Sequence, residues 1–432
     1  MKPRLLFVSP VVPAPGGNGR AMRAFAMLRA LAEQYEVCLL VVDAMLSHTP
    51  AFPELQGWCR AIRHLPRDAG LDAAARRRRQ WSWRLPGLYS LLTGHPPEWP
   101  PPPPGRQALA AAAFAPVRFD ACHVFRLYMA PYAPGGPAGD VPRHLDLDDI
   151  ESRTRRRLAR LLLRRGRLPR ALGALREAAF YERRERLWLP RFQRVYVCSA
   201  DDRAVLAGAL PGLAVSVAPN VASPPAAAVG PPTEDEILFV GNLGYYPNQE
   251  GIAWFCRRVL PPLRRMADRP FTVRVAGGGL PSGLARRLAR IPEVEPVGRV
   301  EAVTPLYRRA RLVVVPVRAG GGTRIKVLEA LAHCRPVVST PTGAEGIAAE
   351  PGQGVLLADR PDHFARHCAD LLARPELAED LGRLGAARVY QDFSPQALRD
   401  CLFPGTPGAG GPGEGECKGD RGPGRRPKDV EG

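Results

Sequence analysis

The sequence predicts an α/β protein made of two domains, each built on a doubly wound parallel sheet. The first observation is a strand, a glycine-rich loop and an amphipathic helix at residues 4–34, followed by an apolar strand at residues 36–43. The same order of elements returns at residues 236–277. The third observation is the length of 432 residues, which exceeds what one hydrophobic core usually supports. Short apolar strands that alternate with helices are typical of parallel sheets covered on both faces.

Changes in composition predict where the domains begin and end. We expect a first domain at residues 1–218 and a second at residues 237–385, joined by a Pro-, Ala- and Gly-rich linker at residues 219–236. A helix at residues 386–402 is expected to cross back to the first domain. The tail at residues 403–432 is rich in Gly and Pro and cannot bury a core, so we expect it to be disordered.

Further elements follow from the local pattern. The Arg-rich stretch 150–190 is predicted to be helical with an interruption at residues 166–169, and the Pro-rich stretch 81–104 to be an irregular excursion. In a doubly wound sheet the ligand lies beyond the carboxyl ends of the strands. The second domain is expected to continue with strands at residues 294–300, 311–318, 335–340 and 354–359, and with helices at residues 301–310, 324–334, 361–374 and 375–391.

The formal net charge of +19 implies an anionic partner, because a strongly basic surface attracts phospholipid, nucleic acid or a phosphorylated substrate. Arginine supplies most of the charge, especially between Arg153 and Arg194 and in the run Arg76–Arg79. An arginine-rich composition that reflects codon usage is the alternative explanation.

The nine cysteines are scattered without a CxxC pair. Cys38 and Cys198 lie in apolar segments, where a free thiol behaves as a small hydrophobe. This pattern predicts a reducing compartment, the cytoplasm, with neither a disulfide framework nor a metal site. No apolar run approaches the length that spans a bilayer, and the stretch from Leu5 to Val8 is too short for a signal peptide.

A glycine loop at residues 320–322 opens onto the helix predicted at residues 324–334. Successive glycines let backbone N–H groups approach a ligand, and a helix start presents free N–H groups and a positive dipole end. Arg324 and Lys326 add positive charge there, which destabilises a helix unless an anion binds. The pattern predicts a diphosphate site; the alternative is a solvated helix start with Thr323 as N-cap.

Glu329 lies farther along the same helix, where its carboxylate is placed to accept a hydrogen bond from a ribose hydroxyl. An ordinary exposed helix glutamate is the alternative. The loop at residues 342–346 offers further backbone N–H groups to the same crevice.

The run from Arg318 to Ile347, RAGGGTRIKVLEALAHCRPVVSTPTGAEGI, resembles the donor-binding signature of the retaining glycosyltransferases of family 4, also called group 1. It is most similar to the subset that has a Gly-rich GTRIKVLEA. The pieces FVGNLGYYPNQEGIAWF, GGNGRAMRAFAML, VAPNV and YQDFSPQAL extend the resemblance to about Leu402. It implies a GT-B fold, in which two Rossmann-like domains face each other across a cleft. The implied activity is transfer of a sugar from a nucleotide-sugar donor to a glycan or lipid-linked acceptor, in the synthesis of a polysaccharide or another cell-surface glycan.

The resemblance also implies roles for single residues. Arg324 and Lys326 would contact the donor diphosphate and Glu329 the ribose, while Gly16 and Gly17 would close over the pyrophosphate from the first domain. It implies no metal or other cofactor, because basic residues and helix dipoles neutralise the leaving nucleoside diphosphate. The sugar is expected to keep its configuration, with the donor phosphate taking the proton of the acceptor hydroxyl. The remaining candidates for donor binding are Gly241, Asn242, Gly322, Thr323, Gly343, Ala344, Glu345 and Gly346.

Two departures from the family pattern concern the donor sugar. Many members carry two glutamates eight residues apart, and eight residues before Glu329 this chain has Gly321. Many also have an Arg and a Lys shortly after the first strand of the second domain, where this chain has GYYPNQEG.

The first domain supplies candidates for the acceptor side. His123 and Arg126 follow an apolar stretch, and either could face the acceptor, although a lone histidine is more often a core residue. We expect Asp146, Asp148 and Asp149 to end a strand that lines the cleft, rather than to form a DxD metal motif.

Other function classes fit less well. A dinucleotide-dependent oxidoreductase would need GxGxxG after a strand, and GGNGR has only GxG. The charge favours nucleic-acid binding, but the arginine runs lack the interleaved aromatic residues that stack on bases. An epimerase of the same fold needs acids and histidines that the sequence does not place in the cleft. A GT-B scaffold that binds without catalysis stays open.

The basic helix predicted at Arg153–Arg170 carries leucines between its arginines. This pattern fits an interfacial helix that holds the protein at the inner face of an anionic membrane. The alternative is a solvated basic helix packed on the first domain. The leucines concerned are Leu158, Leu161, Leu162 and Leu163.

Overall fold

The computed structural model describes residues 1–43, 53–66, 74, 77, 86–99, 106–134, 141–222, 230–347 and 353–404. Several predictions lie wholly or partly outside these residues. They are most of the run Arg76–Arg79, parts of the stretch 81–104, the middle of the linker, and the tail from residue 405.

The first domain is built on a seven-stranded sheet in the order β3-β2-β1-β4-β5-β6-β7, with every pairing parallel. Apolar side chains from alternate positions of each strand fill the two faces, as buried parallel strands require. The strands are β1 Arg4–Ser9, β2 Glu36–Asp43, β3 Cys59–Pro66, β4 Ala121–Phe125, β5 Arg143–Asp146, β6 Arg194–Val197 and β7 Val215–Val217.

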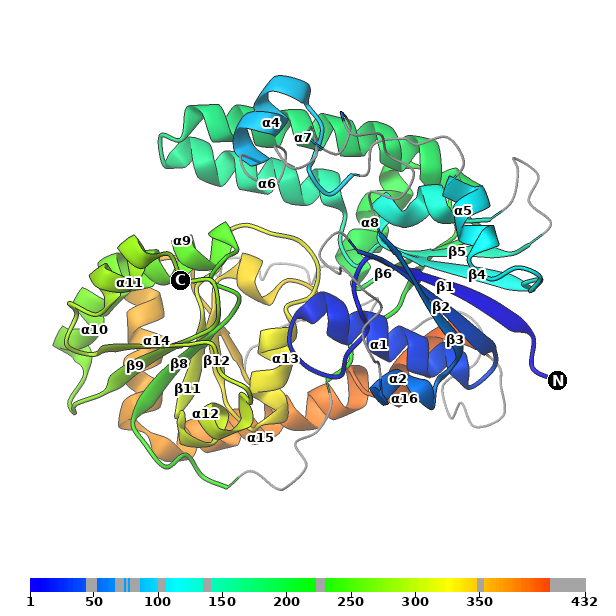
Figure 1. Cartoon of the computed structure of the whole chain (residues 1–432). Helices are drawn as coiled ribbons and strands as arrows, with labels where there is room; N and C mark the ends of the chain where they lie inside the picture. The colour runs from blue at the N-terminus through cyan, green and yellow to red at the C-terminus, as the bar shows by residue number, and fades with distance from the viewer. Residues whose placement is uncertain are drawn as a thin grey trace, which may run out of the picture.

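Helices cover both faces of this sheet (Figure 1). On one face Phe7 packs with Met27 of α1, and on the other Leu6 and Val8 share a core with Tyr181 of α7. The predicted interruption at residues 166–169 is confirmed, because it separates two antiparallel helices, α6 and α7. The helices are α1 Gly19–Ala32, α2 Pro53–Gln56, α4 Pro86–Thr93, α5 Arg106–Ala112, a 3₁₀ helix Leu127–Tyr132, α6 Glu151–Arg164, α7 Leu168–Trp188, a 3₁₀ turn Leu189–Arg191 and α8 Ala200–Ala209.

The second domain holds a six-stranded parallel sheet in the order β10-β9-β8-β11-β12-β13. Two cores flank it, one around Phe239 and Phe364 and the other around Leu328 and Val389. The two sheets confirm the predicted doubly wound architecture. The strands are β8 Glu236–Val240, β9 Thr272–Ala276, β10 Val294–Gly298, β11 Leu312–Val315, β12 Val337–Ser339 and β13 Val355–Leu357.

The first helical segment of this domain begins earlier than the apolar pattern suggests. It starts at Tyr246, because Pro247 fits the first turn of a helix, where its missing N–H has no partner in any case. It then passes through a π-helical stretch, Phe255–Val259, just before Pro261 and Pro262, which cannot donate to the preceding turn. The helices are α9 Tyr246–Trp254, α10 Leu260–Met266, α11 Ser282–Leu288, α12 Thr304–Arg309, α13 Ile325–Ala332, a 3₁₀ turn Pro341–Ala344, α14 Pro361–Ala373 and α15 Pro375–Asp392.

The segment expected to cross back is divided in two. Helix α15 ends at Asp392, and Ser394 caps a separate helix, α16 Pro395–Leu402. Leu398 and Leu402 enter the first-domain core beside α1, so α16 belongs by its packing to the first domain. None of the described helices is long and apolar enough to cross a lipid bilayer.

Candidate functional site

The carboxyl ends of strands from both sheets face the junction between the domains, where two helices begin close together. Helix α1 begins at Gly19 after β1, and α13 begins at Ile325 after β11. A Cβ added at Gly19 would lie only 3.1 Å from Cδ1 of Ile325, so the two helix starts are in contact. Free N–H groups and two positive dipole ends therefore converge here, which favours an anion.

Arg324 is the N-cap residue of α13 and is short of hydrogen-bond acceptors. One of its terminal nitrogens donates to the carbonyl of Gly321. Its Nε and its other terminal nitrogen are buried, and no described group accepts a hydrogen bond from them. A buried charged donor without an acceptor is costly, so an anion bound here would stabilise this guanidinium.

Lys326 lies next to Arg324 and has lost much of its affinity for a proton. Its Nζ donates to Oδ1 of Asn248 over 3.0 Å and lies 5.0 Å from the centre of the Phe239 ring. Burial, reinforced by the charge of Arg324, lowers the pKa of Lys326 to about 7. An anion bound beside these two cations would restore the charged form of Lys326.

Glu329, one turn beyond Lys326, is shifted in the opposite direction. Burial raises the pKa of Glu329 to about 7, against the charge of Lys326. The hydroxyl of Tyr307 is 3.5 Å from its carboxylate. Arg324, Lys326 and Glu329 thus stand together at one end of α13, as the sequence predicts.

The loop after β8 makes room for Lys326. A Cβ at Gly241 would lie 2.5 Å from Nζ of Lys326, so a side chain there would displace the lysine. The side chain of Asn242 accepts a hydrogen bond from the N–H of Gly244 over 2.9 Å and shapes this turn. Gly241 therefore borders the lysine, and Asn242 is linked to it through Asn248, whose side-chain amide donates to the carbonyl of Asn242 over 2.8 Å.

The glycine loop 320–322 requires a correction. A Cβ at Gly321 would lie 2.1 Å from Oγ1 of Thr154, and one at Gly322 would lie 3.2 Å from the carbonyl oxygen of Asp148. Both neighbours belong to the first domain. These two glycines are therefore needed for the domains to approach each other, rather than for a ligand to approach the backbone.

Thr323 holds the same domain contact. Its N–H donates to Sγ of Cys198 over 3.1 Å, and its hydroxyl donates to the carbonyl of Cys198 over 3.1 Å. Its own carbonyl accepts from the side chain of Asn220, in the predicted linker, over 3.2 Å. Thr323 and Gly322, both predicted to bind the donor, thus lie against the first domain.

The loop that follows β12 also contributes to the contact between domains. The carboxylate of Glu345 accepts hydrogen bonds from Arg157 and pairs with Arg153 at 2.8 Å, both on α6. Burial would raise the pKa of Glu345, but these arginines lower it. The carboxylate of Glu345 is thus held by α6, and the expectation that the backbone N–H groups of this loop face the donor stays a prediction.

The other members of this loop are held from within. The N–H of Gly343 donates to Oγ1 of Thr340 over 3.0 Å, and Ala344 is buried. Gly346 has a φ of +76°, and a Cβ there would lie 2.5 Å from Oγ1 of Thr323. The turn is thereby fixed beside the start of α13.

On the first-domain side, Gly16 and Gly17 are exposed just before α1. Nothing lies within 4 Å of a Cβ built at either residue, and Gly17 has a φ of +97°. Asn18 caps the helix that follows. The glycines therefore form an open turn at the junction.

His123 is placed differently from the expectation that it could face an acceptor. It lies within β4, fully buried, with its ring stacked on Phe7 at 5.1 Å between centroids. Burial holds its pKa well below the usual value, so the ring is neutral. Its position in mid-strand, between neighbouring strands of the sheet, removes it from the junction.

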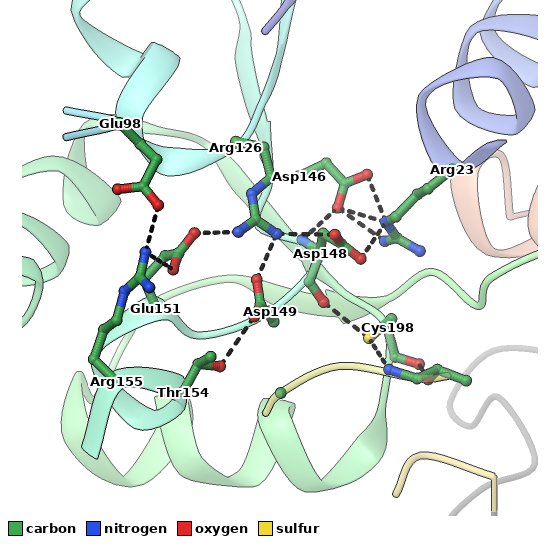
Figure 2. Close-up of polar contacts among 12 residues, drawn as sticks. Arg23, Glu98, Arg126, Asp146, Asp148, Asp149, Glu151, Thr154, Arg155 and Cys198 are labelled. Carbon is green, nitrogen blue, oxygen red and sulfur yellow. Dashed lines mark hydrogen bonds and ion pairs between the residues drawn. The ribbon is translucent and has the colours of Figure 1, made fainter. Parts of the chain in front are cut away.

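A buried network of arginines and carboxylates lies at the carboxyl ends of β4 and β5 (Figure 2). Arg23 of α1 pairs with Asp146 at 2.8 Å. Arg126 pairs with Asp148 at 2.8 Å and also with Asp149 and Glu151. Arg126, expected as a candidate for the acceptor, is therefore surrounded by three carboxylates.

Two residues of this network adopt positive φ angles that non-glycine residues rarely take. They are Arg126 at +76° and Asp148 at +62°. Burial raises the pKa of Asp148 to about 6, although Arg126 and Arg23 act against the shift. The network holds the strand ends and the start of α6 in place. The glycine loop 320–322 packs against this part of the first domain.

Two residues near the junction were not singled out from the sequence. Arg20, in the first turn of α1, is exposed, and no hydrogen bond or ion pair to another described residue involves it. The Tyr128 hydroxyl, with Glu151 and Asp149, raises the pKa of Arg20. The sequence does carry a signal for Arg20: it is a cationic residue directly after GGNG, just as Arg324 is a cationic residue directly after GGGT.

Tyr245 is the second, at the start of α9. Burial raises its pKa, while the charges of Arg324 and Arg20 both act to lower it. Tyr245 therefore lies within electrostatic reach of cations from both domains. Among the described residues, no group of three or more His, Cys, Asp or Glu side chains is placed to hold a metal ion.

Part of the second domain matches a known protein family. Residues 234–374 match the family Glycosyl transferases group 1. The matched segment includes β8, α13 and the loop after β12. A trehalose synthase of Rubrobacter xylanophilus is 34% identical over 133 residues, which cover 30% of each chain. The protein spans about a third of the length of the curated relatives that it matches.

Solved structures are similar over nearly the whole molecule. The sucrose-phosphate synthase of Thermosynechococcus elongatus has a TM-score of 0.61 at 17% identity and covers 92% of this chain and 96% of its own. The fold is GT-B. HepE of Anabaena, solved in complex with UDP-glucose, has a TM-score of 0.56 at 13% identity, with 92% and 97% of the two chains covered.

Proposed function

We propose that this GT-B protein is a glycosyltransferase that moves a sugar from a nucleotide-sugar donor to a glycan or lipid-linked acceptor. The observation that carries the proposal is Arg324, whose Nε and one terminal nitrogen are buried without an acceptor among the described residues, at a helix start that faces a second helix start. The match of residues 234–374 to group 1 glycosyltransferases covers Arg324, Lys326 and Glu329. The UDP-glucose bound by HepE supports a nucleoside diphosphate sugar as the donor.

The donor diphosphate lies, in this proposal, between the starts of α1 and α13. Arg324 and Lys326 contact it, and the two helix dipoles add to their charge. Because the pKa of Lys326 is lowered to about 7, binding of the diphosphate draws a proton onto Lys326. Gly16 and Gly17 approach the diphosphate from the first domain, and Glu329 accepts a hydrogen bond from a ribose hydroxyl.

Transfer then proceeds with the sugar configuration kept, as in the retaining family 4. The departing phosphate oxygen takes the proton of the acceptor hydroxyl on the same face of the sugar. The protein contributes the position of the reactants and stabilises the negative charge that develops on the leaving group. This charge is balanced by Arg324, Lys326 and the helix starts, and we propose that no metal ion is needed.

The acceptor belongs to a polysaccharide or another cell-surface glycan, and the enzyme works in the cytoplasm. A lipid-linked acceptor would require work at the inner face of the membrane. The acceptor side is supplied by the first domain, where Arg20 and the loop around Tyr128 border the junction.

The proposal is tested by thermal unfolding with a panel of nucleoside diphosphates and their sugars, without added metal. A ligand that binds the native state stabilises it by about 2.7 kcal/mol at about a hundredfold excess over Kd. We expect one nucleotide to raise the Tm of the wild type and of Arg286→Ala, an exposed residue of α11, but not of Arg324→Ala. A protein that no nucleotide stabilises would contradict the donor site. Binding without hydrolysis or transfer would identify a non-catalytic scaffold.

A further inference from the structure

The helical hairpin of α6 and α7 divides its arginines into two groups. Residues 152–176 contain ten arginines and no Asp or Glu. Five of the ten form ion pairs, and their carboxylate partners lie towards the junction or on neighbouring helices. These are Arg153, Arg155, Arg156, Arg157 and Arg165. The other five are exposed and pair with no described carboxylate: Arg160, Arg164, Arg167, Arg170 and Arg176.

The exposed leucines of the hairpin lie beside the unpaired arginines. The expectation that α6 is the interfacial helix is corrected, because Leu161 and Leu162 are each 4% exposed and Leu162 packs with Ala171 and Ala174 of α7. Helix α7 instead leaves Leu168, Leu172 and Leu175 between 42% and 63% exposed.

These leucines belong to one face of α7. Positions 168, 172, 175, 176, 179, 183 and 187 follow the spacing of a single helix face. The glutamates of α7 point elsewhere, with Glu177 paired to Arg155, Glu182 to Arg156, and Glu185 bonded to Ser152, all on α6. The leucine–arginine face, as we call it, consists of Leu168, Leu172, Leu175, Arg176, Arg183 and Leu187, with Leu163, Arg164 and Arg167 at the turn of the hairpin.

Helix α4 extends this face. It packs along α7, as Figure 1 shows, and leaves Leu88 and Leu92 exposed by 44% and 59%. Between the end of α4 and α7 lies a groove of about 430 Å³, lined by Arg176, Arg183 and Arg184 and by no carboxylate.

We propose that the leucine–arginine face docks on the surface of a lipid bilayer that contains anionic phospholipids. Transfer of exposed leucines from water to the acyl boundary of the bilayer is favourable, and arginines beside them reach the phosphates of the headgroups. The groove between α4 and α7 offers three guanidinium groups to such phosphates. The charge on this face is of one sign, which matches an anionic surface.

Nucleic acid fits the same charge but not the same face. Single strands are held by exposed aromatic rings, whereas this face offers leucines, and the nearby rings of Phe180 and Trp99 are covered by Arg184. Against a phosphate backbone the exposed leucines would stay in contact with water. A lipid surface would remove them from water.

The face lies close to the proposed active site. The hairpin turn reaches the second domain, where Arg165 pairs with Glu250 and Arg167 lies over the ring of Tyr246 at 4.9 Å from its centre. A membrane on this face would hold the junction beside the headgroups, where a lipid-linked acceptor would be presented. The docking itself does not rest on nucleotide binding or transfer.

The test is co-sedimentation of the whole protein with vesicles of phosphatidylglycerol and phosphatidylcholine in equal parts, and with vesicles of phosphatidylcholine alone. We expect binding to the mixed vesicles only. Loss of one arginine near an anionic surface weakens binding about fivefold, so the triple variant Arg164→Gln, Arg176→Gln, Arg183→Gln should bind about a hundredfold less. The double variant Leu168→Ser, Leu172→Ser should lose about tenfold.

Matched controls remove the same groups elsewhere. The triple variant Arg286→Gln, Arg287→Gln, Arg290→Gln, on α11 and just after its end, and Leu384→Ser, on α15, should bind as the wild type does. All these side chains are exposed, so thermal unfolding and nucleotide binding should stay unchanged. Equal binding to both vesicle types, no binding at all, or an equal loss in the controls would overturn the proposal. The proposal would also be overturned if the protein bound duplex DNA and not the vesicles, and if the same variants lost that DNA binding.

Discussion

Two arginines that flank the same junction have opposite surroundings. Arg126, at the end of β4, is 1% exposed and pairs with three carboxylates, Asp148, Asp149 and Glu151. Arg324, at the start of α13, keeps two buried nitrogens without an acceptor among the described residues. Both terminal nitrogens of Arg126 contact carboxylates and only its Nε lacks an acceptor, whereas Arg324 makes one hydrogen bond, to a carbonyl. The charge of Arg126 is therefore compensated within the first domain, while Arg324 pairs with no described carboxylate.

Removal of each arginine is expected to change the free energy of unfolding differently. A buried ion pair contributes little relative to an apolar substitute, but removal of one partner leaves the other charges buried and unpaired. Buried guanidinium nitrogens without an acceptor have already lost their hydration without compensation. The framework arginine, Arg126, should therefore matter for folding, and the site arginine, Arg324, for binding.

The largest effect is expected when the framework is broken. Arg126→Ala would remove the cation that three buried carboxylates share, leaving Asp149 without an ion pair and Asp148 and Glu151 with only the more distant Arg23 and Arg155, and should lower the free energy of unfolding by roughly 3–5 kcal/mol. Arg324→Ala should change it by less than about 1 kcal/mol without ligand, because no described acceptor loses more than the one contact with Gly321. Urea denaturation of both variants measures the difference. Equal losses of stability would remove the distinction between framework and site.

A second prediction concerns the contact that joins the two sides. Gly321→Ala places a Cβ 2.1 Å from Oγ1 of Thr154 and 3.1 Å from Cβ of Asp149, so the domains must move apart. We expect a cost of about 1–3 kcal/mol to the closed arrangement and a larger radius of gyration by small-angle scattering. Gly283→Ala, where nothing lies within 4 Å of the added Cβ, is the control. An unchanged radius together with unchanged nucleotide affinity would show that this glycine is not needed for the approach of the domains.

The part of the site that was predictable from the sequence is the part that one continuous segment builds. Arg324, Lys326 and Glu329 lie on one helix after one strand, and the order of strand, glycine and helix is legible locally. The two sheets were predictable for the same reason, because each strand and helix carries its own apolar pattern.

Contacts between distant segments could not be predicted in this way. The glycines of loop 320–322 suggested a ligand, but their neighbours Thr154 and Asp148 lie more than 160 residues earlier in the chain. The leucines of α6 showed that it has an apolar side, yet not that α7 covers it. The neighbours of His123 could not be read from its local pattern, since its ring packs on Phe7 of β1 and beside Tyr196 of β6.

The smallest effect, and the sharpest test of the unsatisfied side, is the pH dependence of nucleotide binding. Lys326 and Glu329 both have pKa values displaced to about 7, downward for the lysine and upward for the glutamate. The diphosphate needs the charged lysine, which is lost as the pH rises above 7. The ribose hydroxyl needs the charged glutamate, which is lost as the pH falls below 7. Affinity should therefore be greatest near pH 7 and fall on both sides, by up to about tenfold per pH unit.

Two variants separate the limbs of this profile. Lys326→Met should remove the alkaline limb, and Glu329→Gln the acid limb, when Kd is measured by calorimetry between pH 5.5 and pH 9. Arg324→Ala should weaken binding at every pH and move the alkaline limb to higher pH, because the charge of Arg324 lowers the pKa of Lys326. A flat profile in the wild type would mean that the two groups stay charged in the free protein. The desolvation that burial imposes on this side of the junction would then already be compensated, and the contrast with Arg126 would disappear.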